Sequence, residues 1–257
     1  MTISETDFVL VDTETTHRKP EQAELLEVAA RRLDGSLRLV DSFASLVRPT
    51  KPIPAAASAV HHIVDDDVVD APDRATAEDA LLAFIPAAGV PVAHNASYDR
   101  AILGSRFDAL PWLCTERLAH HLTPDAPEFK NATLYYWFGG PKITGALHRG
   151  DADLAITQFN LGELLARYRA FAADVCAGDA DRLAKSEQIE SFLAFAARPY
   201  VMTKWPNFGK HKGVALAEIP FDYFEWCFSP RGLTDMDDDL RWNIDREMRR
   251  RRRGAAA

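Results

Sequence analysis

Residues 8–16 read Phe-Val-Leu-Val-Asp-Thr-Glu-Thr-Thr. Four apolar residues, two of them β-branched, precede two acids that are one residue apart, Asp12 and Glu14. A continuous apolar run of this kind is typical of a strand that is buried on both faces of a sheet. Because side chains alternate across a strand, we expect Asp12 and Glu14 to point to the same side and to lie close together.

Two adjacent carboxylates at the end of a buried strand repel each other and lose hydration. A divalent cation relieves both costs, and Mg²⁺ takes oxygen ligands from a few carboxylates and from phosphate groups. The alternative for this stretch alone is a solvated strand end, in which acids and threonines lead into a turn. Both interpretations stay open at this point, because short motifs also match by chance.

Length and composition limit the class of protein. A chain of 257 residues with 47% apolar residues suits one large domain, or one domain with an appendage, built on a full hydrophobic core. The N-terminal residues lack the basic start and apolar segment of a signal peptide, and no stretch reaches the length of a membrane span. Three cysteines without a CxxC pair argue against a zinc site and indicate reduced thiols. We therefore expect a cytoplasmic protein without a membrane partner.

The charge is unevenly distributed along the chain. The formal net charge of −8 is not typical of a nucleic-acid-binding domain. Acids cluster at residues 65–67 and 235–239, whereas Arg249–Arg253 is a run of five arginines. We interpret this run as a frayed, solvated tail. A negative average still allows local positive surfaces.

The order of the expected elements predicts an α/β fold. The first strand is followed by Leu25–Leu33, whose periodicity allows a helix or a strand, and by a strand over Leu37–Val47. If Leu25–Leu33 is a strand, Asp34-Gly35 is the turn of a hairpin. Strands and helices then alternate. A helix is expected over 76–88, strands at 90–94 and 111–115, a helix after the second of these strands that runs through Leu122, and further helices over 99–107, 131–138 and 151–171. This order predicts a mixed sheet flanked by helices, over residues 1–175.

The remaining residues form a smaller piece. We expect a linker at Ala177–Asp181 and a helix over Lys185–Ala197. The segment after it is rich in aromatic residues and short turns and is too small for a large core of its own. We therefore assign residues 181–257 to a C-terminal appendage that ends in the arginine-rich tail.

Acids occur in three separate blocks near expected element ends: Val11–Thr16, His94–Asp99 and His148–Asp153. In this order the blocks resemble those of the DEDDh exonucleases, the DnaQ-like group of the ribonuclease H fold. The third block has the histidine, four residues, aspartate spacing of that group. Each block alone is a weak signal, but three in order over about 140 residues are a strong one. The resemblance covers residues 7 to about 171.

The C-terminal piece narrows the resemblance to one subgroup of these exonucleases. Phe208–Gly213, followed by Ile219-Pro220 and Tyr223–Trp226, is similar to the C-terminal segment of exonuclease X-like proteins. One position departs from the family pattern: Asp151 stands where an apolar or small residue is expected, and it could compete with Asp153 as a metal ligand.

The resemblance implies a metal-dependent 3′→5′ exonuclease that releases nucleoside 5′-monophosphates from DNA. It implies two Mg²⁺ ions, for which Mn²⁺ can substitute, and His148 as the general base. The acids that it implies as metal ligands and catalytic residues are Asp12, Glu14, Asp99 and Asp153. The residues that it implies as holders of the terminal nucleotide are Thr13, Thr15 and Asn95.

Several alternatives stay open. An exoribonuclease on the same fold differs in how its pocket treats a 2′-hydroxyl, which no residue decides here. A non-catalytic nucleic-acid-binding module would keep the fold alone, although the complete set of acids and His148 argues against it. The Lys210-His-Lys212 turn fits either a contact with a phosphate backbone or an exposed hairpin turn. We expect the 3′ ends of single-stranded DNA as the partner. A repair or replication protein that docks on residues 180–257 and the oligomeric state are also open.

Overall fold

A computed structural model describes residues 1–143, 150–234 and 236–254 of the chain. These residues form two compact units, Met1–Ala197 (unit 1) and Arg198–Ala257 (unit 2), and each unit is described by itself. The three cysteines are free thiols. Among the described residues, no helix has the length and apolar character needed to cross a membrane.

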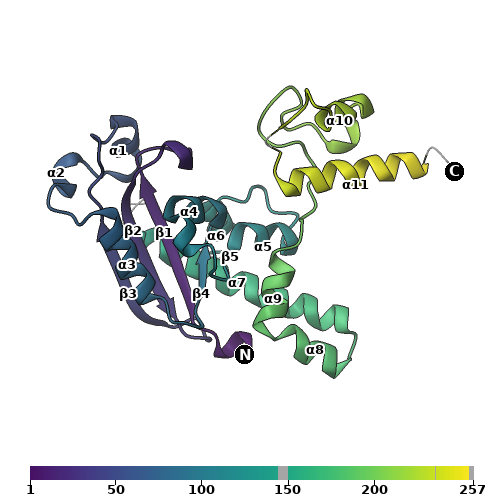
Figure 1. Cartoon of the computed structure of the whole chain (residues 1–257). Coiled ribbons are helices and arrows are strands. Elements are labelled where there is room, and N and C mark those ends of the chain that lie inside the picture. The colour runs from purple at the N-terminus through teal and green to yellow at the C-terminus, as the bar shows by residue number, and fades with distance from the viewer. Residues whose placement is uncertain (144–149, 235, 255–257) are drawn as a thin grey trace. The chain divides into compact units, whose positions relative to one another are not determined.

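Unit 1 is built on a five-stranded mixed sheet with the strand order β3-β2-β1-β4-β5 (Figure 1). The strands are β1 (Phe8–Thr15), β2 (Leu25–Leu33), β3 (Leu39–Leu46), β4 (Val90–Ala93) and β5 (Leu113–Cys114). Strand β2 is antiparallel to both of its neighbours, β1 and β3, whereas β4 pairs parallel to β1 and β5 pairs parallel to β4. This sheet, with its flanking helices, confirms the predicted fold class.

Strand β1 lies at the centre of the sheet and is buried on both faces. Phe8 and Leu10 belong to a core on one face, whereas Val9 and Val11 belong to a second core on the opposite face. The alternation of side chains along the strand explains this division. The even-numbered residues of β1 therefore share the face of Leu10, and the odd-numbered residues share the face of Val9.

Helices cover both faces of the sheet (Figure 1). Helix α7 (Gly150–Cys176) packs across β1 and β2, and its leucines join the core of Leu10. On the opposite face, α3 (Arg74–Phe84) and α4 (Ala96–Leu103) join the core of Val9. The other helices up to residue 137 are α1 (Ala55–His61), α2 (Asp65–Val68), α5 (Thr115–Leu122), α6 (Asn131–Trp137) and the 3₁₀ helices η1 (Ile3–Glu5), η2 (Pro20–Gln22) and η3 (Ser105–Phe107).

The structure decides between helix and strand for Leu25–Leu33, because this segment is β2. Its connection to β3 is longer than the predicted two-residue turn. The Asp34 carboxylate accepts hydrogen bonds from the N–H groups of Ser36 and Arg38, which closes the turn. A Cβ atom on Gly35 would lie 1.9 Å from the Ser4 carbonyl oxygen. Gly35 is therefore required by the close approach of the N-terminal segment rather than by the turn alone.

Helices α8 (Ala180–Ser186) and α9 (Ile189–Ala196) belong to unit 1. The side chains of Ile189 and Phe192 are buried in the same core as Tyr168 of α7. Tyr168 and Phe192 lie 4.7 Å apart between ring centroids. The compact unit that contains the sheet thus continues to Ala197 because α9 completes its core.

Unit 2 contains η4 (Leu216–Glu218), α10 (Phe221–Cys227) and α11 (Asp238–Gly254). It has a small hydrophobic core of its own. The buried residues of this core are Trp205, Leu216, Ile219, Phe224, Cys227, Leu240, Ile244 and Met248. The core is therefore shared by η4, α10, α11 and the loop that carries Trp205.

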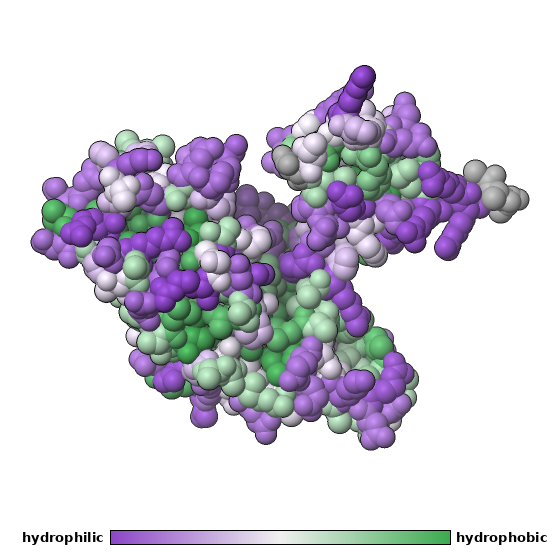
Figure 2. Space-filling model, in the orientation of Figure 1, coloured by the Kyte–Doolittle hydropathy of each residue, from purple (hydrophilic) through white to green (hydrophobic). Residues whose placement is uncertain are grey.

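The arginine run is helical rather than frayed, because it forms the last turns of α11, although four of its five residues are exposed as the sequence suggested. Figure 2 shows this end of the helix as hydrophilic. The Arg251 guanidinium nevertheless donates hydrogen bonds of 2.7 Å to the carbonyl oxygens of Ile219 and Leu216. It also pairs with Glu247 at 2.8 Å. These bonds tie the helix to the segment before α10 and stop it from fraying.

The arginine contacts generate the first prediction. Arg251→Ala removes hydrogen bonds to the Ile219 and Leu216 carbonyl groups and one of the two arginine partners of Glu247, which costs about 1–3 kcal/mol. We expect faster hydrogen exchange of the backbone amides of η4 and α10, measured by mass spectrometry. Arg253→Ala, an exposed position of the same run, is the matched control and should leave exchange unchanged. Equal exchange in the two variants would contradict the structural role of Arg251.

Candidate active site

Three carboxylates from two distant parts of the sequence, β1 and α7, meet beside the end of β1. One oxygen from each of Asp12, Glu14 and Asp153 can be chosen so that all three lie within 4.8 Å of one another. Asp12 and Glu14 lie on the face of Leu10, which is the face that α7 covers, and Asp153 belongs to the first turn of α7. The fold thus brings together three of the four acids of the predicted metal site.

A glycine at the start of α7 lets Asp153 come close to the sheet. A Cβ atom on Gly150 would lie only 2.4 Å from the Cβ atom of Ala29 on β2. Any larger residue would therefore push the beginning of α7 away from the sheet. Asp153 lies one turn further along the helix, so the lack of a side chain at Gly150 and the small side chain of Ala29 help to determine where its carboxylate lies.

Asp99, the fourth acid, approaches from the opposite face of the sheet. It lies in the first turn of α4, and its Oδ1 atom accepts a hydrogen bond of 2.8 Å from the Thr13 hydroxyl group. Burial raises the pKa of Asp99 to about 7, although the bonds from Thr13 act in the opposite direction. Asp99 is not among the three clustered carboxylates, but its charge acts on Asp12.

The carboxylates disturb one another strongly. Burial raises the pKa of Asp12 well above its usual value, and the charges of Asp99, Glu14, Asp153 and Glu27 raise it further. The protein alone therefore favours the protonated forms of Asp12 and Asp99. Oxygen donors that repel one another in this way are the ligand set that a hard divalent cation prefers, so the residues present fit Mg²⁺ or Mn²⁺.

Glu27 is a fifth carboxylate that the sequence did not reveal. It lies on β2 directly opposite Glu14 in the antiparallel register. Its side chain is buried, and its Oε2 atom has no hydrogen-bond partner within the described part of the chain. The sequence could have indicated this residue only if the pairing of β1 and β2 were known. A single glutamate in an apolar segment does not by itself indicate a site.

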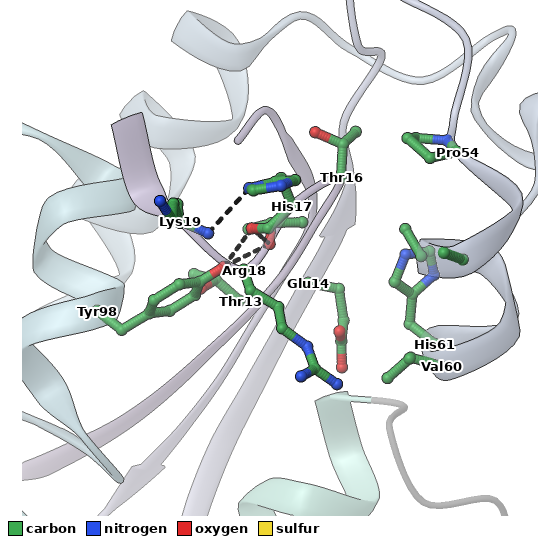
Figure 3. A pocket seen from close by; sticks show the side chains of 13 residues that line it. Thr13, Glu14, Thr16, His17, Arg18, Lys19, Pro54, Val60, His61 and Tyr98 are labelled. Atoms are coloured by element: carbon green, nitrogen blue, oxygen red, sulfur yellow. Dashed lines mark hydrogen bonds between the residues drawn. The ribbon is translucent and has the colours of Figure 1, made fainter. Parts of the chain in front are cut away.

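A pocket of about 630 Å³ lies next to Glu14 (Figure 3). One wall comes from β1 and the residues after it, including Thr13, Thr15 and Arg18, and the opposite wall comes from α1 with Val60 and His61. Figure 3 shows the Arg18 guanidinium group and the Glu14 carboxylate pointing to the same side of the pocket. The sequence indicated the two threonines but not the arginine.

Tyr98 of α4 is bonded to the pocket wall that β1 and the residues after it form. Its hydroxyl group lies 2.6 Å from the Thr15 hydroxyl group and donates to the carbonyl oxygen of His17 at 2.9 Å. Tyr98 therefore fixes the segment that follows β1. The sequence gave no reason to select this residue, although it directly precedes Asp99.

Asn95, the third predicted substrate-binding residue, does not line this pocket. It is exposed and has a left-handed backbone (φ 66°) at the N-terminal cap of α4. Its Oδ1 atom accepts a 2.8 Å hydrogen bond from the Ser97 hydroxyl group. These observations indicate that Asn95 turns the chain from β4 into α4.

His94 supports the site from inside the protein. Its Nε2–H group donates to the Phe129 carbonyl oxygen at 2.7 Å, and its Nδ1 atom lies 3.0 Å from the Thr115 hydroxyl group. Burial lowers its pKa to about 4, so the ring is neutral at pH 7 and Nδ1 accepts. This geometry gives His94 a positioning role.

Two residues of the third block are not placed by the structure. His148, the predicted general base, lies outside the described residues. The side chain of Asp151, the possible competitor of Asp153, is also outside the described part. Their assignments stay predictions from the sequence.

The contact of Gly150 with Ala29 can be tested by unfolding experiments. Gly150→Ala forces α7 from the sheet and should destabilise unit 1 by about 1–3 kcal/mol. In the double variant with Ala29→Gly the added methyl group fits, so most of this loss should be recovered. Thermal unfolding of the two single variants and the double variant measures the coupling. Losses that simply add would show that the two side chains do not meet.

The raised pKa of Asp99 makes the stability of the metal-free protein depend on pH. Between pH 3.8, the ordinary value, and about 7, the folded state holds a proton that the unfolded state has lost. Stability should therefore fall as the pH rises through this range, by up to about 1.4 kcal/mol per pH unit. Asp99→Asn should flatten this dependence of the melting temperature, whereas Asp125→Asn, at an exposed site, should not. The same slope in both variants would exclude Asp99 as its source.

Comparisons with known proteins agree with this geometry. The RNase T family profile, described as exonuclease, matches residues 9–157, which include all four acids of the site. Exodeoxyribonuclease 10 of Escherichia coli strain K12 is 29% identical over 243 residues, covering 91% of this chain and 96% of that protein. An uncharacterized exonuclease of Escherichia phage 186 is 36% identical over 174 residues, covering 60% of this chain and 85% of that protein.

A solved structure, exonuclease X in complex with 5′ overhanging duplex DNA, has a TM-score of 0.53 and 28% sequence identity. The match covers 69% of this chain and 98% of that chain. The family uses divalent metals, in agreement with the carboxylate cluster. The resemblance that the three sequence blocks indicated is confirmed: the chain belongs to the RNase T family of exonucleases, DnaQ-like nucleases of the ribonuclease H fold that act on nucleic acid.

Proposed function

We propose that this chain is a 3′→5′ exodeoxyribonuclease that hydrolyses DNA from its 3′ end and releases nucleoside 5′-monophosphates. The observation that carries the proposal is the meeting of Asp12, Glu14 and Asp153 oxygens within 4.8 Å. The similarity to exonuclease X, which was solved with DNA, supports DNA as the polymer. The free thiols suit a reducing compartment, so we place the reaction in the cytoplasm.

The acids of the site are proposed to hold two Mg²⁺ ions, and Mn²⁺ should substitute. These four acids are Asp12, Glu14, Asp99 and Asp153. The bound ions supply charge neutralisation at the phosphate group and activation of a water molecule. The chain contributes the arrangement of the acids: Thr13 orients the Asp99 carboxylate, and Gly150 lets Asp153 reach the other acids.

We assign the proton transfer to His148. A neutral imidazole takes a proton efficiently near pH 7, because its pKa lies near the working pH. A ring nitrogen of His148 would accept the proton of the attacking water. This role rests on the four-residue spacing before Asp153, which is that of the DEDDh group.

The pocket beside Glu14 is proposed to hold the 3′-terminal nucleotide. Its volume of about 630 Å³ lies within the range of small-molecule sites. Thr13 and Thr15 border it on β1, and Tyr98 holds the Thr15 hydroxyl group in place. Arg18, which also lines the pocket, provides a positive charge for a phosphate group of the substrate.

The proposal is tested with end-labelled single-stranded DNA and RNA. In Mg²⁺ we expect labelled DNA to be digested to mononucleotides, and in EDTA we expect no digestion. Asp12→Ala should lower the rate about a thousandfold or more, because several kcal/mol of transition-state stabilisation are lost. The melting temperature should not fall, since removing one acid relieves repulsion.

Asp125→Ala, a change of the same type at an exposed position, is the control and should keep the full rate. Unchanged turnover in Asp12→Ala would contradict the assignment of the site. Faster digestion of RNA would favour the exoribonuclease. No digestion of either polymer would favour a binding module without catalysis.

A further inference from the structure

The two units of the chain differ in charge. Residues 198–257 contain 12 of the 30 lysines and arginines but only 9 of the 38 acids. The formal charge of unit 2 is therefore +3, whereas that of residues 1–197 is −11. A positively charged unit attached to an acidic one attracts polyanions at a place of its own.

Most arginines of the run at residues 249–253 already form ion pairs within unit 2. Arg249 pairs with Asp245 at 2.8 Å, and Arg250 and Arg251 both pair with Glu247. Arg251 is also bonded to backbone carbonyl groups. Much of the positive charge of the arginine run is therefore already paired, and further cations of the unit lie outside it.

Two free cations occupy the loop at residues 206–213. Lys210 and Lys212 are exposed, and neither forms an ion pair with any described residue. The loop has a defined stem, because the N–H group of Trp205 donates to the Val214 carbonyl oxygen at 2.8 Å and the N–H group of Gly213 donates to the Trp205 carbonyl oxygen at 3.1 Å. The lysines are thus presented by a structured loop rather than by a disordered segment.

Aromatic side chains lie beside these lysines. The buried Trp205 ring lies 5.8 Å from Phe208 and 5.3 Å from Tyr223 between centroids, and Tyr223 stacks on Trp226 at 5.2 Å. The row ends in two exposed rings, since Phe208 is 44% exposed and Trp226 is 42% exposed. His211, between the two lysines, lies 4.3 Å from Tyr223 and joins the loop to the row.

We propose that this surface of unit 2, formed by Phe208, Lys210, Lys212 and Trp226, binds single-stranded DNA. The lysines would neutralise phosphate groups, and the exposed rings would stack on bases. Single-stranded DNA fits better than duplex DNA, because its base faces are accessible to aromatic rings. The proposal goes beyond the catalytic site and takes from the proposed function only the choice of DNA as the polymer.

The acids of α10 limit the path that the bound DNA strand can take. Asp222 and Glu225 are exposed neighbours of Tyr223 and Trp226, and Glu225 lies 3.9 Å from Arg252. Phosphate groups are repelled on that side. The strand is therefore expected to place its backbone along the lysine loop and its bases toward the aromatic row.

The test measures binding without cleavage. The full chain is titrated in EDTA against fluorescein-labelled oligothymidylate, and anisotropy gives the Kd at several salt concentrations. The double variant Lys210→Glu/Lys212→Glu should bind about tenfold more weakly or worse, and its log K against log salt slope should be shallower by about 1.4. Phe208→Ala and Trp226→Ala should each weaken binding about fivefold or more.

The matched control is Arg182→Glu/Lys185→Glu, which makes the same change of charge at two exposed positions of α8 in unit 1. It should bind within about twofold of the unaltered chain. Equal losses of affinity in the two double variants would show that only the overall charge matters and would overturn the proposal. Tighter binding of blunt duplex DNA than of the oligothymidylate, or no loss of affinity in the lysine variant, would also overturn it.

Hydrolysis of a small ester, thymidine 5′-p-nitrophenyl phosphate, in Mn²⁺ separates this proposal from the proposed function. The ester occupies only the catalytic site, so the lysine and aromatic variants should hydrolyse it at the unaltered rate. Loss of ester hydrolysis in these variants would overturn the separate role of unit 2. Failure of the unaltered chain to hydrolyse the ester and DNA would contradict the proposed function, but would leave the binding result intact.

Discussion

Mutual repulsion of carboxylates at the end of one buried strand is the constraint on which the rest of the structure depends. Asp12 is surrounded by other acids, and its pKa is raised by burial and by their charges. Such a cluster is unfavourable for the folded protein alone, because buried charge without a partner is costly. A site that concentrates negative charge in this way is stabilised when a divalent cation binds. The arrangement therefore lowers the stability of the metal-free folded protein but provides the ligands that the chemistry at the phosphate group needs.

Because β1 is buried on both faces, helices from both sides of the sheet bring acids to its end. Even-numbered residues face α7, so Asp12 and Glu14 meet Asp153, while Thr13 on the other face holds Asp99 of α4. Helices from both sides of the sheet thus contribute acids beside this strand, and Gly150 allows the start of α7 to lie close to β2. Unit 2 follows a different principle. Arg251 ties α11 to the elements of its small core, whereas lysines and exposed aromatic rings are left for a partner.

Much of unit 1 could be predicted from the sequence, since local pattern determines β1, α6 and the mixed sheet. The clustered acids were also within reach, because their blocks keep a recognisable order and spacing. Glu27 was not, because its place opposite Glu14 depends on strand register. Tyr98 and Arg18 were missed because the pocket forms from segments far apart in sequence. Arg251 was misread as part of a solvated tail, because its carbonyl partners lie more than 30 residues away. Non-local contacts account for each of these failures.

Anomalous diffraction from crystals soaked in Mn²⁺ tests the central claim most directly, because it locates the ions without any assumption about activity. The account predicts manganese bound by oxygens of Asp12, Glu14 and Asp153, with Asp99 at the same site. Manganese bound elsewhere, or no ordered manganese beside these carboxylates at saturating concentration, would contradict it.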